Sequence, residues 1–263
     1  MFSVTYAQLN GWLTAFLWPF TRLIAMIAVA PVLGNRSLQT QVKIGLAAFV
    51  TLIVAPTLPP MPQVTVFSAA GIWILANQFL IGVALGFTMQ VVFAVVTAAG
   101  DIMGLGMGLG FASFFDPESA SNSSALSSLF NMFASLAFLV FDGHLQMIAA
   151  LVASFQSLPI SANVLAAPGW RELAGWGTVV LSSGMLLALP VVAALLITNL
   201  SLGILNRAAP QIGIFQIGFA VTMLVGMLLI LAMLPNMIPF FARLFDGGVE
   251  EMGRVAAALH AAG

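Results

Sequence analysis

The sequence has very little charge and no cysteine. Charged side chains make up 6% of its 263 residues and hydrophobic side chains make up 61%, whereas a soluble domain carries about 25% charged residues. Without cysteine there is no disulfide, no thiol nucleophile and no thiolate metal ligand. A net charge of −1 provides no basic surface for nucleic acid. The composition therefore excludes an ordinary soluble domain and a nucleic-acid-binding protein.

Long stretches of the chain carry no charge at all. They are Ile44–Gly100, Leu173–Asn206 and Ala208–Ala242. A helix that crosses a bilayer needs about 20 mostly apolar residues, so each stretch is long enough. The first ten residues contain no lysine or arginine, unlike a cleavable signal peptide, and we expect the first apolar run to be retained. These features predict a polytopic membrane protein.

The spacing of apolar runs and turn residues predicts an all-α membrane protein of about six long, broken hydrophobic helices arranged as hairpins. Four prolines between residues 56 and 64 mark a loop, and the connection Asn206–Gln211 is short enough for a tight helical hairpin. We expect a break at Asp142-Gly143 and a weakly amphipathic tail at Val249–Leu259. The predicted helices are Trp12–Leu33, Ser37–Ala55, Ile72 to the glycine run, Ala125–Phe155, Trp176–Leu205 and Ile214–Phe245.

The distribution of lysine and arginine indicates how the chain is oriented, because cytoplasmic connections carry an excess of both. None precedes the first helix, whereas Arg36 and Lys43 follow it. We therefore expect this connection, and the hairpin that contains Arg207, on the cytoplasmic side. Three arginines favour the opposite orientation: Arg171, Arg243 and Arg254.

The most distinctive segment begins at the end of the third predicted helix. Glycine occupies alternate positions there, which makes a continuous helix costly and lets backbone approach backbone. These glycines are Gly104, Gly106, Gly108 and Gly110. Three phenylalanines and an Asp-Pro turn signal come next, as Phe111, Phe114, Phe115, Asp116 and Pro117. Broken backbone at membrane depth is tolerated only inside protein or along a cavity, so the segment predicts a passage with bulky apolar side chains lodged in it.

Polar and small residues interrupt the apolar helices. Arg22 lies near the middle of the first helix, where an unpaired charge costs about 2.5–3.5 kcal/mol. It either serves as a structural partner, for a backbone carbonyl or for a carboxylate such as Asp101, or lines a pore. Gly82 and Gly86 have the GxxxG spacing of closely packed membrane helices. Further small and polar residues of the same helix predict packing inside a larger helical assembly: Asn77, Gln78, Gly100 and Gly104.

The sequence offers no convincing catalytic, metal or nucleotide site. Asp142-Gly-His144 pairs a carboxylate with an imidazole but lacks a nucleophile and a third ligand, so a helix break with a polar cap is the better interpretation. Lys43, the single lysine, follows no glycine-rich phosphate loop. Asp101 lacks the Gly-x-Gly-Asp motif of intramembrane aspartyl proteases. We therefore expect no enzymatic activity, no metal and no cofactor.

Three long stretches carry a more specific signal. They read WPFTRLIAMIAVAPVLGNRSLQTQVKIGLA, ALGFTMQVVFAVVTAAGDIMGLGMGLGFASFFDP and LGILNRAAPQIGIFQIGFAVT. Together with DGHLQMI at Asp142–Ile148, they strongly resemble the FliR family, the export-gate subunit of the bacterial flagellar type III secretion system. The Asn-Arg-x-x-Pro-Gln hairpin is specific to that family. Two positions depart from the family pattern: Asp142 replaces the usual asparagine, and Ala220 replaces a proline that often follows Gly-Phe, so we expect a straighter last helix.

The resemblance implies a subunit that joins several copies of FliP and FliQ around a central export channel, surrounded by membrane lipid. The channel would carry unfolded flagellar proteins across the bacterial inner membrane at the flagellar basal body. Residues 1–170 would form a FliP-like part, and residues 171–263 a FliQ-like helical hairpin with a C-terminal tail. The glycine-rich stretch, about residues 104–124, matches the plug that blocks the family's channel at rest.

The side chains of this stretch suit a plug. Phe111, Phe114 and Phe115 can dewet a constriction, while Met103 and Met107 are flexible apolar fillers that yield and reseal. The glycines, with Met103 and Met107, would form the hinge and apolar gasket of the plug. Three alternatives stay open: the aromatics pack in the core, the chain is a scaffold without a gate, or it is a secondary transporter or channel for a small solute. A transporter would need a second helix break, and the later half has no second glycine run.

The last hairpin is the second predicted contact site. Its connection is too short to bury its polar residues, which are Asn206, Arg207 and Gln211, beside Pro210. The resemblance implies that it contacts the gate protein FlhB. In the alternative interpretation, Arg207 is only an anchor that keeps this end on the cytoplasmic side.

Overall fold

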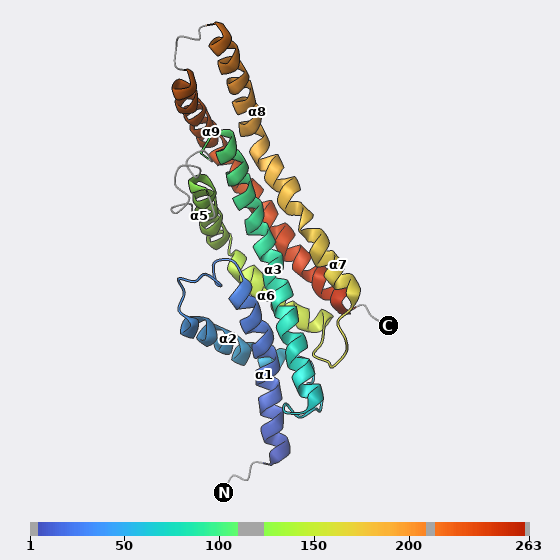
Figure 1. The fold of residues 1–263 in the computed structure, drawn as a ribbon. Helices are drawn as coiled ribbons and strands as arrows, with labels where there is room; N and C mark the ends of the chain where they lie inside the picture. The colour runs from blue at the N-terminus through green and yellow to red at the C-terminus, as the bar shows by residue number, and fades with distance from the viewer. Residues whose placement is uncertain (1–4, 110–123, 209–213, 261–263) are drawn as a thin grey trace. The chain divides into compact units, whose positions relative to one another are not determined.

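A computed structural model describes residues 5–109, 124–208 and 214–260, and these residues form helices and no strand (Figure 1). The predicted all-α class is confirmed. The elements are α1 Tyr6–Val29, α2 Thr40–Val54, the 3-10 helix η1 Ala55–Thr57, α3 Ala69–Gly106, α5 Ala125–Val140, α6 Gly143–Ser157, α7 Ala167–Trp176, α8 Thr178–Ala208 and α9 Ile214–His260.

Five of these helices are long and apolar enough to cross a membrane, and α5 and α6 can together form a sixth, broken span. The expected break at Asp142 is confirmed, because this residue has the left-handed φ of 55° that ends one helix before the next begins. The expected polar cap is wrong, since the Asp142 side chain makes no capping hydrogen bond. Instead, the Asp142 carbonyl accepts the N–H groups of Leu145 and Gln146.

Helix α9 is longer than predicted and α7 was missed. The sequence predicted that the last helix ends at Phe245 and that a separate tail follows, but α9 runs without a break to His260. Arg254 binds Glu250 at 2.6 Å across one helical turn, which supports the helix at this point. The next turns are held by packing, because Val255 and Leu259 are buried.

The chain forms two compact units. The first consists of Met1–Val91, Asp142–Gly177 and Phe245–Gly263, and the second of Val92–Phe141 and Thr178–Leu244. Helices α3 and α9 each contribute to both units. The division into a FliP-like part and a FliQ-like hairpin stays a prediction.

The first unit packs α1, the beginning of α3, α6, α7 and the end of α9 around a hydrophobic core. Trp18, Leu85 and Phe155 are buried in it. The backbone N–H of Ala166, just before α7, donates to the Leu259 carbonyl of α9 at 3.0 Å. Helix α2 is mostly exposed along its length, so its apolar face is available to lipid or to another protein.

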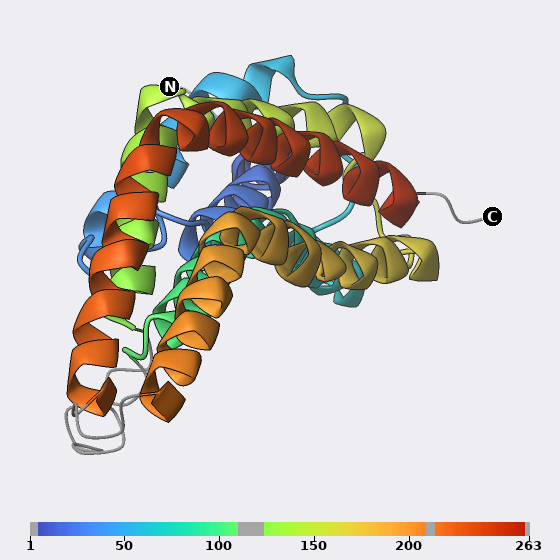
Figure 2. The same ribbon diagram turned by 90° about the horizontal axis from the view of Figure 1, so that it is seen from above.

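The second unit consists of the end of α3, α5, α8 and the first part of α9. Helix α8 and this part of α9 run side by side in both views (Figures 1 and 2). Gly184 allows α8 to approach α3 closely, because a Cβ at this position would lie 3.2 Å from the Val95 carbonyl oxygen. Phe93 of α3 packs edge-on against Phe138 of α5. The end of α3 therefore packs against α8 and α5 of its own unit.

Candidate functional site

The plug residues predicted from the sequence fall partly outside the described residues. Those outside are Gly110, Phe111, Phe114, Phe115, Asp116 and Pro117. The described part of the predicted hinge and gasket consists of Met103, Gly104, Gly106, Met107 and Gly108. These five residues lie at the C-terminal end of α3, within the second unit.

The end of α3 is a regular glycine-capped helix terminus. The Leu109 N–H donates to the Gly104 carbonyl at 2.9 Å, and the Gly108 N–H donates to the Leu105 carbonyl at 3.0 Å. Gly108 has a φ of 85°, which strongly favours glycine. This pattern is a Schellman motif, which satisfies the last carbonyls of a helix. The alternate glycines therefore do not break the helix at Gly104; they end it after Gly106.

Gly100 and Gly106 allow close contact with neighbouring helices. A Cβ at Gly100 would lie 2.5 Å from the Cα of Ser127 in α5. A Cβ at Gly106 would lie 3.1 Å from Cδ1 of Leu195 in α8. Close packing, rather than backbone freedom, is the reason for glycine at these positions.

Both methionines of the predicted gasket are buried, and Met107 is held by α9. Only 1% of the Met103 and Met107 surfaces is exposed. The Met107 side chain occupies the space that a Cβ at Gly226 would need. The hydroxyl of Thr222, one turn earlier in α9, donates to the Met107 carbonyl at 3.2 Å. Sequence reasoning missed Thr222 and Gly226, because no motif connects them to the glycine run.

The chain returns to the same turn of α3 when it re-enters the described residues at Ser124. The Ser124 hydroxyl donates to Asp101 Oδ1 at 3.0 Å and also accepts the Ser127 N–H, which caps α5. A Cβ at Gly104 would lie 3.3 Å from Ser124 Oγ and 3.8 Å from Leu109 Cδ1. The two described residues that flank residues 110–123, Leu109 and Ser124, therefore both lie against the same turn of α3.

Arg22 is completely buried in the first unit and makes structural contacts there. Its Nε donates to Gln78 Oε1 at 2.8 Å, and its Nη1 and Nη2 donate to Ser154 Oγ and the Leu158 carbonyl at 3.0 Å each. The guanidinium carbon lies 4.1 Å from the ring centroid of Phe155. No carboxylate of the described residues pairs with Arg22. The arginine thus joins α1, α3 and the end of α6.

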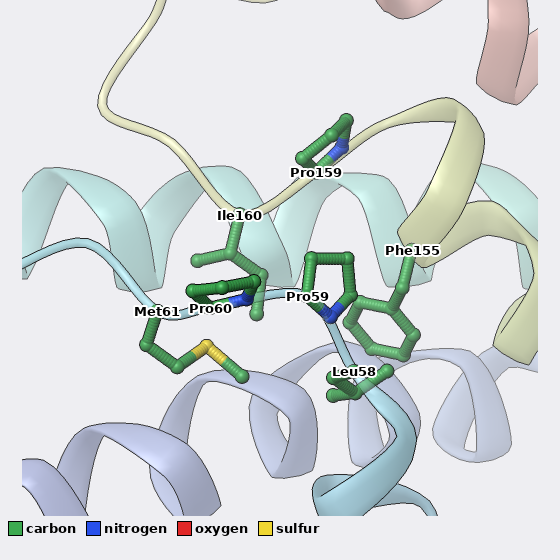
Figure 3. A pocket seen from close by; sticks show the side chains of 7 residues that line it. All are labelled: Leu58, Pro59, Pro60, Met61, Phe155, Pro159 and Ile160. Carbon is green, nitrogen blue, oxygen red and sulfur yellow. The ribbon is translucent and has the colours of Figure 1, made fainter.

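Apolar side chains cover the Phe155 ring. Figure 3 shows the proline-rich loop after η1 beside this ring. A cavity of about 20 Å³ lies between them. The residues that line it are Leu58, Pro59, Pro60, Met61, Phe155, Pro159 and Ile160. The loop predicted from the four prolines is confirmed, and it lies beside the Phe155 ring that the Arg22 guanidinium also contacts.

Gly82 and Gly86 bring α3 into direct backbone contact with α1. A Cβ at Gly82 would collide with the Arg22 carbonyl oxygen, and a Cβ at Gly86 would lie 2.8 Å from the Met26 carbonyl oxygen. The sequence predicted that this face of α3 packs against other subunits. At Gly82 and Gly86 it packs against α1 of the same chain instead.

The connection between α8 and α9 is described only as far as the end of α8. Asn206 and Arg207 lie in the last turn of α8 and are exposed, whereas Pro210 and Gln211 lie outside the described residues. A cation in the last turn of a helix interacts favourably with the helix dipole.

Comparison with known proteins defines the class. Residues 13–248 match the family described as bacterial export proteins, family 1. A protein named "Flagellar biosynthetic protein FliR" from Pectobacterium carotovorum subsp. carotovorum is 47% identical over 90% of either chain. Proteins of the same name from Escherichia coli (strain K12) and Bacillus subtilis (strain 168) are 46% and 24% identical, over 94% and 92% of this chain and 94% and 95% of their own. The chain therefore belongs to the bacterial export proteins of family 1, and within them to the FliR family.

Proposed function

We propose that this protein is a subunit of the flagellar type III export gate in the bacterial inner membrane, at the flagellar basal body. Membership of the FliR family supports a role in flagellar export. In the finer proposal, the chain forms part of the channel for unfolded flagellar proteins and seals it at rest with residues 110–123. FliP and FliQ are the proposed partners in the gate, with FlhB in contact with the assembly.

The observation that best supports the plug is that the two described residues flanking residues 110–123 both lie on one turn of α3. Leu109 and Ser124 both approach Gly104, and hydrogen bonds at Gly104 and Asp101 hold them there. A segment attached in this way can project bulky side chains without disturbing the helices that support it. Phe111, Phe114 and Phe115 in this segment are apolar enough to keep a narrow passage dry.

Removing the aromatic side chains is expected to open the gate to ions. In cells that produce the complete gate, we expect Phe114→Gly with Phe115→Gly, or deletion of residues 111–123, to raise sodium and proton leakage severalfold. The deletion keeps Ser124, because this residue caps α5 and binds Asp101. Membrane potential measured with a fluorescent dye, together with ²²Na⁺ uptake, provides the test.

Phe67→Gly is the matched control, because this phenylalanine is 89% exposed in a loop of the first unit. It should leave conductance unchanged. Unchanged conductance in the Phe114 and Phe115 variants, with the gate still assembled, would exclude the plug while leaving a role in export intact.

The α8–α9 hairpin is the proposed contact with FlhB. A photo-crosslinking residue at Asn206 or Gln211 should form its main adduct with FlhB in membranes that contain the whole gate. Asn206 is exposed in the last turn of α8, so the probe does not disturb packing there. A probe at exposed Leu181, near the other end of α8, is the control and should not capture FlhB. Adducts with lipid alone from Asn206 and Gln211 would leave Arg207 as an anchor and remove this contact from the proposal.

A further inference from the structure

A groove of about 500 Å³ lies between α8 and α9 in the second unit. Apolar side chains form most of its wall, among them Leu186, Met233, Met237 and Phe240. Its polar groups are few: Ser183 on α8, and Asn236 and Arg243 on α9. A volume in the range of about 300–1,000 Å³ with a few polar groups is typical of a site for one small molecule.

The polar groups of the groove have unused hydrogen-bonding capacity. Arg243 Nε donates to the Pro239 carbonyl at 3.2 Å, which holds the side chain along α9. Its two Nη groups donate to no described residue, and no described carboxylate pairs with it. The side chains of Ser183 and Asn236 likewise make no hydrogen bond within the described part of the chain. These groups can bind a ligand without giving up a contact.

Arg243 is the charged residue at the end of the long uncharged part of α9. No charged residue occurs in α9 before it, and Arg243 is the first charge after that uncharged run. Met233, Asn236 and Phe240 follow one another at helical spacing along the face that leads to Arg243. The groove is therefore mostly apolar along α9 and carries one positive charge, that of Arg243, at one end.

We propose that this groove binds one anionic phospholipid. The phosphate would bind the free Nη groups of Arg243, and the glycerol and ester oxygens would lie near Asn236 and Ser183. One acyl chain would lie along Leu186, Met237 and Phe240. A positively charged group at one end of an apolar groove between spanning helices is typical of lipid headgroup sites, and Arg243, with its free Nη groups, provides this charge.

Binding of a defined lipid to the delipidated full-length chain in nonionic detergent tests the proposal. Native mass spectrometry would titrate palmitoyl-oleoyl phosphatidylglycerol, phosphatidylcholine with the same chains, and glycerol phosphate without chains. We expect phosphatidylglycerol to bind most tightly and glycerol phosphate not to bind in the same range. Arg243→Gln should weaken phosphatidylglycerol binding about fivefold and remove most of its advantage over phosphatidylcholine.

Two further variants separate a site from general attraction. Asn236→Trp would fill the groove from an exposed position and should reduce binding of both lipids. Arg36→Gln removes an exposed arginine outside the groove and should change nothing. The proposal is overturned if Arg243→Gln binds like the unmodified chain, if Arg36→Gln loses as much affinity, or if glycerol phosphate binds as tightly as the lipid. It is equally overturned if a photo-crosslinker at Asn236 in the whole gate captures a protein instead of lipid.

Discussion

Replacing Gly82 and Gly86 together with leucine is expected to remove the protein from the membrane. The new side chains would meet the carbonyl oxygens of Arg22 and Met26, which are backbone atoms in the middle of α1 and cannot turn aside. Overpacking costs about 1–3 kcal/mol per site, so the pair should lose about 2–6 kcal/mol. Folded proteins are stable by only about 5–15 kcal/mol, so a loss of this size removes a large part of the free energy of unfolding. We expect less than a tenth of the normal amount of chain, measured by immunoblot, and loss of motility.

The control is a second pair of helical glycines with open surroundings. A Cβ at Gly45 in α2, or at Gly203 in α8, has no neighbour within 4 Å. Gly45→Leu with Gly203→Leu adds the same atoms and should leave the amount of chain nearly unchanged. Normal amounts of the Gly82 and Gly86 variant in the membrane would show that α1 and α3 do not pack as described. Normal amounts of chain that fail to join the gate would instead place these glycines at a contact with another subunit.

The class and most helix positions follow from composition and periodicity, because a long uncharged run has few other stable forms in a bilayer. The C-terminal end of helix α9 could not be predicted in this way. Gly247-Gly248 and the charges after Arg243 look like the end of a helix, so the prediction stopped at Phe245. The structure continues the helix because Val255 and Leu259 are buried in the first unit, and the local sequence does not reveal that packing.

The glycine run shows a similar limit at the site. The sequence correctly indicated an unusual backbone at the end of α3. However, glycine can either end a helix or allow two helices to pack closely. Gly106 is the last helical residue and packs against Leu195, whereas Gly108 follows the helix with a positive φ. Leu195 is far away in the sequence, so the choice between the two roles depends on tertiary contacts. Thr222 and Gly226 could not be found for the same reason.

The surroundings of Arg22 were equally inaccessible from the sequence. The sequence required that a charge in an apolar helix have a partner, and left a backbone carbonyl, a carboxylate and water as possibilities. Its three partners are 56, 132 and 136 residues away, and they are an amide, a hydroxyl and a carbonyl. The complete burial of Arg22 favours the structural interpretation over the pore-lining one, and mutation distinguishes the two.

Arg22→Met is expected to lower the free energy of unfolding of the first unit without a direct effect on the channel. Methionine keeps much of the side-chain volume but leaves Gln78 Oε1 and the Leu158 carbonyl without their donor. Each buried polar group left unsatisfied costs about 1–3 kcal/mol, so we expect a loss of about 3 kcal/mol. Thermal unfolding of the full-length chain in detergent measures it. Arg36→Met, at an exposed arginine, is the control and should change stability little.

A rescue experiment then decides between the two roles of Arg22. Adding Gln78→Leu and Ser154→Ala to Arg22→Met removes two polar partners together with the arginine, and replacing both sides of a buried hydrogen bond by apolar groups is often nearly neutral. Insertion into the bilayer also becomes cheaper, since an arginine at the centre of a helix costs about 2.5–3.5 kcal/mol. We therefore expect the triple variant to regain at least half of the lost stability and to restore motility with it. A triple variant that is as stable as the unmodified chain but still fails to export would show that the guanidinium itself acts on the channel, against the structural role that its contacts indicate.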